Sequence, residues 1–429
     1  FWLKAVLAQI AHTLRQSHRR RPVCNMAGVD APKQVCVCGG GNGGHVMAVL
    51  IPSHLPETKL NILSIFSGET ENWMKAVAAN GSMTLDMTEH DASSRRIVAS
   101  PSLITNDPAQ AAQGSDVFFL SAPATYHQQY LEAIAPFVED GATIVGMPAY
   151  PGFVWVLNKI FGKDKVSKIN VVRCSNLPWA CRIISYGASV QVLGTKSMIL
   201  ACTSERAKLI KPQLCLGKYP VLQYSSGIAA DLMTINPYVH LALMYAFWSR
   251  WDGQPMDTEP LLYQGVDEFA VQVMSTLSDE LVLSVRDAVK QIGSGIDLDV
   301  VVHISRLYLD LYAADTDVDS SSLLRCLQTN RAYRGLKHSM KKVEGGKFVP
   351  DMKCRYMTED LPMGLVPQRA IAHCLGFETP MTDTVITWCQ EMLGKEYLKD
   401  AELNGKDIAE TRAPVNFGIS TIDEILCLP

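Results

Sequence analysis

The residues from Val35 to His45 constrain the fold of this chain more than any other stretch. A short apolar run leads directly into a Gly-x-Gly-x-x-Gly turn made by Gly39, Gly41 and Gly44, and the apolar residues Val46–Ile51 follow. In a strand–turn–helix unit of this kind, backbone N–H groups and the positive end of the helix face a pyrophosphate. The first glycine makes the turn, the second lets the phosphate approach, and the third lets the helix pack on the strand. We therefore predict a dinucleotide site that contains Gly39, Gly41, Asn42, Gly43 and Gly44.

An acid about 20 residues beyond the glycines is expected to bind the ribose hydroxyls of the dinucleotide. Glu69 is the nearest candidate, 25 residues beyond Gly44 and just past the end of the apolar run Leu60–Phe66. No arginine stands at that strand end to receive a 2′-phosphate, so the sequence favours NAD (NADH) over NADP. The alternative role for Glu69 is that of a first-turn acid stabilised by the helix dipole.

The pattern along residues 33–227 predicts an α/β Rossmann-type domain. Strand-length apolar segments alternate with helical ones, which indicates a parallel sheet covered by helices on both faces. After the first strand, the expected strands and helices are Leu60–Phe66, Glu69–Ala79, Asp116–Ser121, Tyr126–Val138, Ala142–Gly146, Ile169–Cys174, Val190–Leu193 and Val221–Tyr224. The loops 122–124 and 147–149 follow strand ends and should line the ligand crevice.

Residues 228–429 change to helical spacing and predict an all-α second domain. The clearest helices are Glu268–Ile292, Leu298–Tyr312, Pro367–Leu375 and Thr382–Leu393, separated by glycine and proline clusters. A parallel-sheet nucleotide domain followed by a helical domain is an architecture of two-domain dehydrogenases. We expect the substrate in the cleft between the two domains.

Length and composition exclude several classes of protein. A chain of 429 residues predicts two or three domains. Hydrophobic residues at 48% and charged residues at 19% describe a globular protein, and a net charge of -4 gives no reason to expect nucleic acid or a membrane surface as partner. No apolar run reaches the roughly 18–20 residues of a membrane-spanning helix.

The twelve cysteines are scattered and form no Cys-x-x-Cys pair. Cys36 and Cys38 lie two apart on the presumed first strand, so they should share one face and act as small core residues. This usage predicts reduced, buried thiols in a cytoplasmic protein. We predict no metal site.

Residues 1–32 are set apart from the fold as a leader. The first 25 residues are basic and free of acids, with an apolar start, and in this they resemble an organelle-targeting peptide. However, the chain begins with Phe1, and Met26 stands just ahead of the first strand. We therefore favour Met26 as the natural start and expect the leader to be disordered or not native.

Hydride transfer to a carbonyl or imine needs a proton donor near neutral pH, and histidine is the usual one. Of ten histidines, His240 opens the helical domain, where a side chain would face the cleft, although a structural role is the alternative. A carboxylate usually fixes such a histidine, and the polar cluster Arg355–Pro362 offers one. Spacing does not show that the two meet, so the residues alone predict an NAD-dependent oxidoreductase with an unassigned substrate.

Several separate motifs carry a resemblance to a known family. In order along the chain they are Val35–Gly44, Leu177–Arg182, Leu193–Lys196, Trp251–Gly253, Tyr263–Gly265, Arg355–Met363 and Gly394–Leu398. From about Met26 to its end, the chain resembles the invertebrate opine dehydrogenases, the family of octopine, tauropine, alanopine and strombine dehydrogenases. In that family NADH reduces the imine formed between pyruvate and the amine of an amino acid, which regenerates NAD in anaerobic glycolysis.

The resemblance implies roles for three residues and a monomeric protein. His240 would be the catalytic acid/base, Asp360 would orient and support it, and Arg355 would reach the cofactor pyrophosphate from the helical domain. An arginine fork suits a pyrophosphate, and closure of the domains excludes water from an imine that would otherwise hydrolyse. The alternatives are an interdomain salt bridge for Arg355 and a loop or helix cap for Asp360.

Departures from the family pattern concern the substrate. Ser175 and Asn176 stand where the octopine branch is expected to have an acid that meets the guanidinium of arginine. A cation buried there without a counter-charge would be unfavourable. We therefore expect taurine or a small neutral amino acid, with tauropine as the first choice of product and alanopine or strombine next.

Four residues are candidates for substrate binding. Tyr150 stands where a smaller polar residue is expected to hold pyruvate, and Asn176 offers a donor to a carboxylate. Trp251 and Tyr263, with Trp248, would wall the amino-acid pocket, and core packing is the alternative for these aromatic residues. Two rival functions remain open: a two-domain NAD-dependent reductase of a 2-keto acid or phosphoketone without an amine, and a non-enzymatic NAD-binding regulator.

Overall fold

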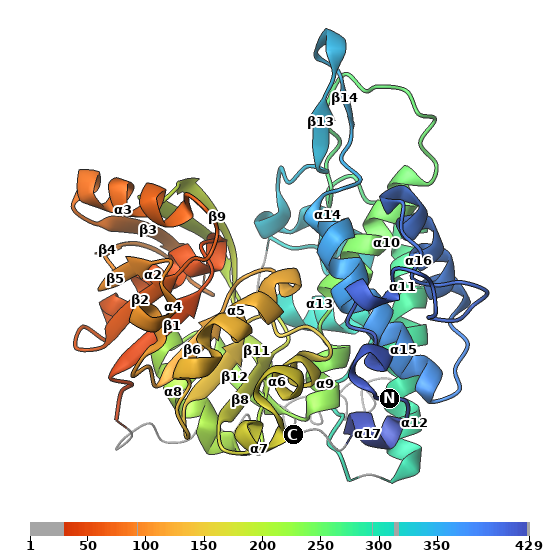
Figure 1. Ribbon diagram of the computed structural model, residues 1–429. Helices are drawn as coiled ribbons and strands as arrows, with labels where there is room; N and C mark the ends of the chain where they lie inside the picture. Colours follow the sequence, from red (N-terminus) through yellow and green to blue (C-terminus); the bar gives the residue numbers. More distant parts are fainter. Residues whose placement is uncertain (1–29, 92, 294, 313–316, 427–429) are drawn as a thin grey trace, which may run out of the picture.

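The computed structural model describes residues 30–91, 93–293, 295–312 and 317–426 (Figure 1). Residues 1–29 of the predicted leader lie outside this part of the chain. A sheet-containing half, red to yellow-green in Figure 1, is followed by a mainly helical half in green to blue. The two-domain fold class predicted above is therefore observed.

The first half is built on an eight-stranded sheet with the order β12-β11-β8-β7-β6-β1-β2-β5. Its strands are β1 (Gln34–Cys38), β2 (Lys59–Leu63), β5 (Leu103–Thr105), β6 (Val117–Leu120), β7 (Thr143–Gly146), β8 (Asn170–Cys174), β11 (Met198–Cys202) and β12 (Val221–Ser225). All neighbours pair in parallel except β11, which runs antiparallel to β8. The expectation of a purely parallel sheet was wrong at this one junction.

Helices cover both faces of this sheet, and its central strands are therefore buried on both sides. Val35 and Val37 of β1 pack with the first group of helices, and Cys36 and Cys38 pack with the second, so the predicted shared face of the two cysteines is confirmed. The first group is α2 (Asn42–His54), α3 (Glu69–Asn80) and α8 (Ile210–Leu216). The second is α4 (Pro108–Ala112), α5 (His127–Ile134), α6 (Phe153–Phe161) and α7 (Lys163–Val166).

A second, four-stranded sheet with the order β4-β3-β10-β9 was missed from the sequence. Its strands are β3 (Met83–Thr88), β4 (Ser94–Ala99), β9 (Trp179–Ser185) and β10 (Ser189–Thr195). Val190–Leu193 was predicted to finish the main sheet but belongs to β10 of this one. Buried and half-buried positions alternate along β3, and the sheet packs against α2. As a result α2 lies between two sheets and is buried on all sides from Gly43 to Ile51.

The second half surrounds α10 (Asn236–Trp248), which is buried along most of its length. The other α-helices are α9 (Gly227–Leu232), α11 (Glu268–Ser278), α12 (Ser284–Ile292), α13 (Ile304–Tyr312), α14 (Leu323–Thr329), α15 (Val366–Cys374), α16 (Pro380–Leu393) and α17 (Ile422–Leu426). The predicted helix Glu268–Ile292 is one continuous element in which the π-helical turn η4 (Asp279–Leu283) joins α11 to α12. A hairpin of β13 (Met340–Lys342) and β14 (Phe348–Pro350) corrects the all-α expectation.

Shorter helical segments complete the architecture. They are η1 (Ala124–Tyr126), η2 (Ala135–Phe137), η3 (Arg206–Leu209), η5 (Arg331–Tyr333), η6 (Glu344–Gly346), the π-helical η7 (Tyr356–Leu365), η8 (Ile408–Glu410) and η9 (Pro414–Phe417). Among the described residues, no helix is long and apolar enough to cross a membrane, and no cluster of side chains is suited to a metal ion. The ten cysteines of the described ranges are all free thiols.

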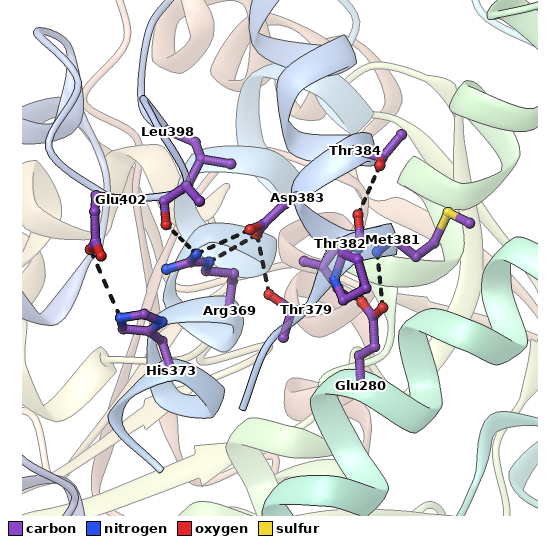
Figure 2. A network of polar contacts seen from close by, with 12 residues as sticks. Glu280, Arg369, His373, Thr379, Met381, Thr382, Asp383, Thr384, Leu398 and Glu402 are labelled. Carbon is purple, nitrogen blue, oxygen red and sulfur yellow. Dashed lines mark hydrogen bonds and ion pairs between the residues drawn. The ribbon is translucent and has the colours of Figure 1, made fainter. Parts of the chain in front are cut away.

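Polar contacts hold α16 against its neighbours, as Figure 2 shows. The Glu280 carboxylate, from η4, accepts the backbone N–H groups of Met381 (2.9 Å) and Thr382 (2.8 Å) at the start of the helix. Arg369 of α15 forms a two-pronged ion pair with Asp383 at 2.9 and 3.1 Å. A carboxylate at a helix start and a bidentate pair both favour one fixed geometry, so this network stabilises the packing of α16 within the helical half.

Candidate active site

The glycine turn between β1 and α2 leaves room for a ligand at one position. A Cβ on Gly39 would lie 2.8 Å from the Ala122 nitrogen, and one on Gly44 would lie 2.0 Å from the Gly39 oxygen. Gly39 also has φ +125°, which disfavours any side chain. Beside Gly41, by contrast, nothing lies within 4 Å of a Cβ. The turn therefore fits the predicted approach of a pyrophosphate at Gly41.

Polar groups flank this turn. The Glu69 carboxylate, at the start of α3, accepts a hydrogen bond from Ser64 and lies beside Gly40. The Tyr186 hydroxyl also lies beside Gly40 and is buried without a hydrogen-bond partner among the described residues. A carboxylate and an unpartnered hydroxyl at this place suit ribose hydroxyls. Asn42 differs, because its side-chain oxygen accepts the Ile183 N–H at 2.9 Å and ties α2 to β9.

Two of the predicted residues, 120 positions apart, meet in the structure. His240 Nδ1 donates to Asp360 Oδ2 at 2.8 Å, with 14% and 4% of the two side chains exposed. His240 comes from α10 and Asp360 from η7, and Tyr356 covers the imidazole with ring centroids 4.1 Å apart. No described residue bonds His240 Nε2. The carboxylate therefore fixes the tautomer and leaves Nε2 without a partner among the described residues.

The local sequence explains how η7 approaches α10 so closely. A Cβ on Gly364 would lie 2.1 Å from Pro237, so only glycine fits at this contact. Pro362, inside η7, cannot donate a backbone hydrogen bond, which favours a widened turn over a regular α-helix. The Pro362 carbonyl instead accepts the Arg412 N–H at 2.9 Å.

Glu359 and Arg355 form an ion pair beside the His240–Asp360 pair. Arg355 Nε and Nη2 donate to Glu359 Oε2 at 2.8 and 2.6 Å, and Glu359 Oε1 accepts the Ala124 N–H at 2.8 Å. Burial raises the pKa of Glu359, and the Arg355 charge opposes that shift. The pair lies within η7 and its N-terminal flank, so the alternative of a salt bridge across the domains is wrong. With 67% of its side chain exposed, Arg355 keeps donors available for an anionic ligand.

No described contact brings three of the four substrate candidates, Asn176, Trp251 and Tyr263, to the His240–Asp360 pair. Asn176 donates to Ser175 Oγ at 3.0 Å and to the Met233 oxygen at 3.4 Å. Trp251 donates its indole N–H to the Gln254 oxygen at 2.9 Å and packs edge-on against Trp248. Tyr263 stacks on Tyr333, with ring centroids 4.1 Å apart. Trp251 and Tyr263 make the core contacts named as their alternative, and their substrate role stays a prediction. Tyr150 is different, because its hydroxyl donates to Asp360.

Known proteins share this arrangement over almost the whole chain. The family described as NAD/NADP octopine/nopaline dehydrogenase, alpha-helical domain, matches residues 223–393. An octopine dehydrogenase of Pecten maximus is 38% identical over 398 residues, which cover 92% of this chain and 98% of that protein. A tauropine dehydrogenase of Arabella iricolor is 38% identical over 400 residues, which cover 91% and 99%.

This chain belongs to the octopine dehydrogenase family. A solved structure of octopine dehydrogenase with NADH and L-arginine has a TM-score of 0.81 at 38% identity and covers 92% of this chain and 97% of that one. A second solved structure, of octopine dehydrogenase with NADH and pyruvate, has a TM-score of 0.79 at 37% identity and likewise covers 92% of this chain and 97% of that one. The predicted family, fold class, enzyme class and nicotinamide cofactor are confirmed: the chain is an oxidoreductase of an NAD/NADP-dependent family.

One buried polar residue near the site was not predicted from the sequence. Arg412, in the segment after η8, is buried and donates to the Ala149 oxygen at 2.9 Å and to the Ala124 oxygen at 2.8 Å. Both loops were predicted to line the ligand crevice. Burial lowers the pKa of Arg412 to about 10, and the nearby Glu359 charge opposes this shift. A single arginine in a polar tail gives no local signal, so only the folded chain reveals it.

Proposed function

We propose that this octopine dehydrogenase family member reductively condenses pyruvate with an amine, using NADH. The observation that carries the proposal is the His240–Asp360 hydrogen bond of 2.8 Å, in a family whose solved relatives bind NADH with pyruvate or L-arginine. A histidine held by a carboxylate is suited to proton exchange with a reacting carbonyl or imine near neutral pH. NADH, when bound, supplies the hydride.

The chain's own residues then have separable roles. His240 Nε2 exchanges the proton, because Nδ1 is committed to Asp360. Gly41 and the start of α2 receive the pyrophosphate, aided by the exposed donors of Arg355. Glu69 binds the adenosine ribose, which favours NADH over NADPH. Water is excluded from the imine where the two domains, divided at residues 227 and 228, close over the substrates.

For the amine we propose taurine first, then alanine or glycine, which would give tauropine, alanopine or strombine. The support is that Ser175 and Asn176 bring no negative charge to the pocket predicted for the amino acid. A guanidinium there would lose hydration without gaining a counter-ion. A neutral zwitterion such as taurine, alanine or glycine carries no net charge and needs no such counter-ion.

The cellular setting belongs to the same proposal. We place the enzyme in the cytoplasm as a monomer that regenerates NAD during anaerobic glycolysis. The ten free thiols of the described ranges support a reducing compartment.

An amine panel tests the function. With pyruvate and NADH fixed, loss of absorbance at the NADH band is followed for taurine, alanine, glycine and arginine. We expect turnover that requires an amine and is fastest with taurine, and we expect His240→Ala to lose most turnover while it still binds NADH. Oxidation of NADH by pyruvate alone would support the 2-keto acid reductase, and tight NADH binding without turnover on any amine would support the regulator.

A further inference from the structure

Tyr150 connects the nucleotide-binding half of the molecule to the His240–Asp360 pair. It lies in the loop after β7, is 3% exposed, and donates its hydroxyl to Asp360 Oδ1. The other carboxylate oxygen, Oδ2, accepts His240 Nδ1. The carboxylate that holds the imidazole is therefore itself held by a phenol from the other half.

Contacts of the backbone and of the ring hold Tyr150 in place. Tyr150 has φ +61°, a left-handed conformation that a bulky residue keeps only where its surroundings determine it. Next to it, Ala149 N–H donates to the Cys174 oxygen at 2.9 Å, and the Ala149 oxygen accepts Arg412 Nη1 at 2.9 Å. The tyrosine ring lies beside Gly364, with its Cε1 3.4 Å from the Cβ position. Its hydroxyl thus has a set direction toward Asp360.

The Tyr150 hydroxyl acts as a donor because it stays protonated. Burial, followed by the charges of Asp360 and Glu359, raises the pKa of Tyr150 well above its ordinary value. The titratable and charged groups that surround the site come from η7 and its flank, β9 and the C-terminal segment, and they are Cys354, Arg355, Tyr356, Glu359, Arg182 and Arg412.

We infer that Tyr150 is a positioning residue that orients the Asp360 carboxylate and weakens the interaction of this carboxylate with the protonated imidazole of His240. The inference rests on the proposed function, in which His240 exchanges the proton. A carboxylate that accepts two hydrogen bonds shares its charge between them. If the phenol is removed, Asp360 interacts more strongly with His240 alone, and the imidazole keeps its proton to higher pH.

The test is Tyr150→Phe, which removes only the hydroxyl. We expect kcat to fall on the order of tenfold, part of the 10²–10⁴ that positioned acid–base groups contribute, with unchanged affinity for NADH. The high-pH limb of reductive turnover should move to higher pH, because the protonated acid persists there. The matched control is Tyr238→Phe on α10, since that buried hydroxyl has no hydrogen-bond partner among the described residues. It should keep the wild-type pH profile.

A second readout does not depend on turnover. Nitrogen-15 NMR of the His240 imidazole, assigned with His240→Ala, should show its titration moving to higher pH in Tyr150→Phe and not in Tyr238→Phe. An unmoved titration in folded Tyr150→Phe would overturn the inference while leaving the proposed function intact. Wild-type protein without turnover on any amine would overturn the function, and the NMR comparison would still decide the role of Tyr150.

Discussion

At the scale of one residue, His45 shows how the stability of the fold around the glycine turn depends on pH. Its Nδ1 bonds to the Gly41 oxygen at 3.1 Å, its Nε2 accepts the Gly187 N–H at 2.9 Å, and its ring stacks on Trp73. An imidazole that donates at one nitrogen and accepts at the other is neutral. Burial accordingly lowers the pKa of His45 to about 4.

Acid should therefore destabilise the protein through His45. Below about pH 6.5 His45 binds a proton in the unfolded chain, whereas in the folded chain it stays neutral down to about pH 4. The free energy of unfolding therefore falls as the pH falls through this window. Between pH 7 and pH 5 the loss is about 2 kcal/mol. We expect His45→Gln to reduce the acid-induced loss by that amount in urea titrations followed by tryptophan fluorescence.

Two comparisons would make the His45 measurement decisive. His90→Gln replaces an exposed imidazole and should keep the wild-type loss of stability between pH 7 and pH 5. The explanation fails if His45→Gln loses as much stability over this interval as the wild-type protein does.

At the scale of elements, different glycines of the turn between β1 and α2 serve packing and ligand binding. Gly44 is required by packing, because a methyl group there would lie 2.0 Å from the Gly39 oxygen. Gly41 has no such neighbour and has φ −81°, which alanine adopts freely. The two glycines of one motif thus meet different physical demands.

Gly41→Ala should fold like the wild-type protein but bind NADH at least about tenfold more weakly, since the methyl group occupies the approach to the pyrophosphate. Gly44→Ala should lose several kcal/mol of stability, because overpacking displaces backbone. Thermal unfolding and NADH fluorescence titrations measure both effects. Wild-type NADH affinity in Gly41→Ala would exclude the turn as the pyrophosphate site.

The elements that sequence reasoning recovered share a simple signal. Strands buried on both faces, such as β1 and β7, are continuous apolar runs, and the structure ends them within a few residues of the predicted bounds. β4 was missed because it is half exposed and carries Arg95 and Arg96. The meeting of His240 with Asp360 depends on how η7 packs on α10, which no local pattern encodes. Only the family resemblance suggested that pair.

At the scale of the whole molecule, three residues join the two halves around the candidate active site. Glu359 accepts the Ala124 N–H, Tyr150 donates to Asp360, and Arg412 binds the carbonyls of Ala124 and Ala149. Each contact uses the loop after β6 or after β7, where ligands bind in open α/β sheets. The contacts that hold the halves together therefore also shape the site.

Arg412→Lys should weaken this junction. One ammonium group cannot reproduce the fork that reaches both carbonyls, and each buried acceptor left without a donor costs about 1–3 kcal/mol. We expect a lower melting temperature and reduced kcat. As a control, Arg96→Lys alters a solvent-exposed pair with Asp86, with side chains 66% and 47% exposed, and should change stability by less than about 1 kcal/mol. Equal melting temperatures for the two variants would contradict this role.

The position of Arg412 late in the chain has a consequence for biosynthesis. Ribosomes extend a protein from its amino end, and the nucleotide-binding half emerges long before this arginine. Until residue 412 has left the exit tunnel, the carbonyls of Ala124 and Ala149 lack their guanidinium partner. A nascent chain could thus hold the dinucleotide early, yet the junction between its two halves would close only after residue 412 has emerged from the ribosome.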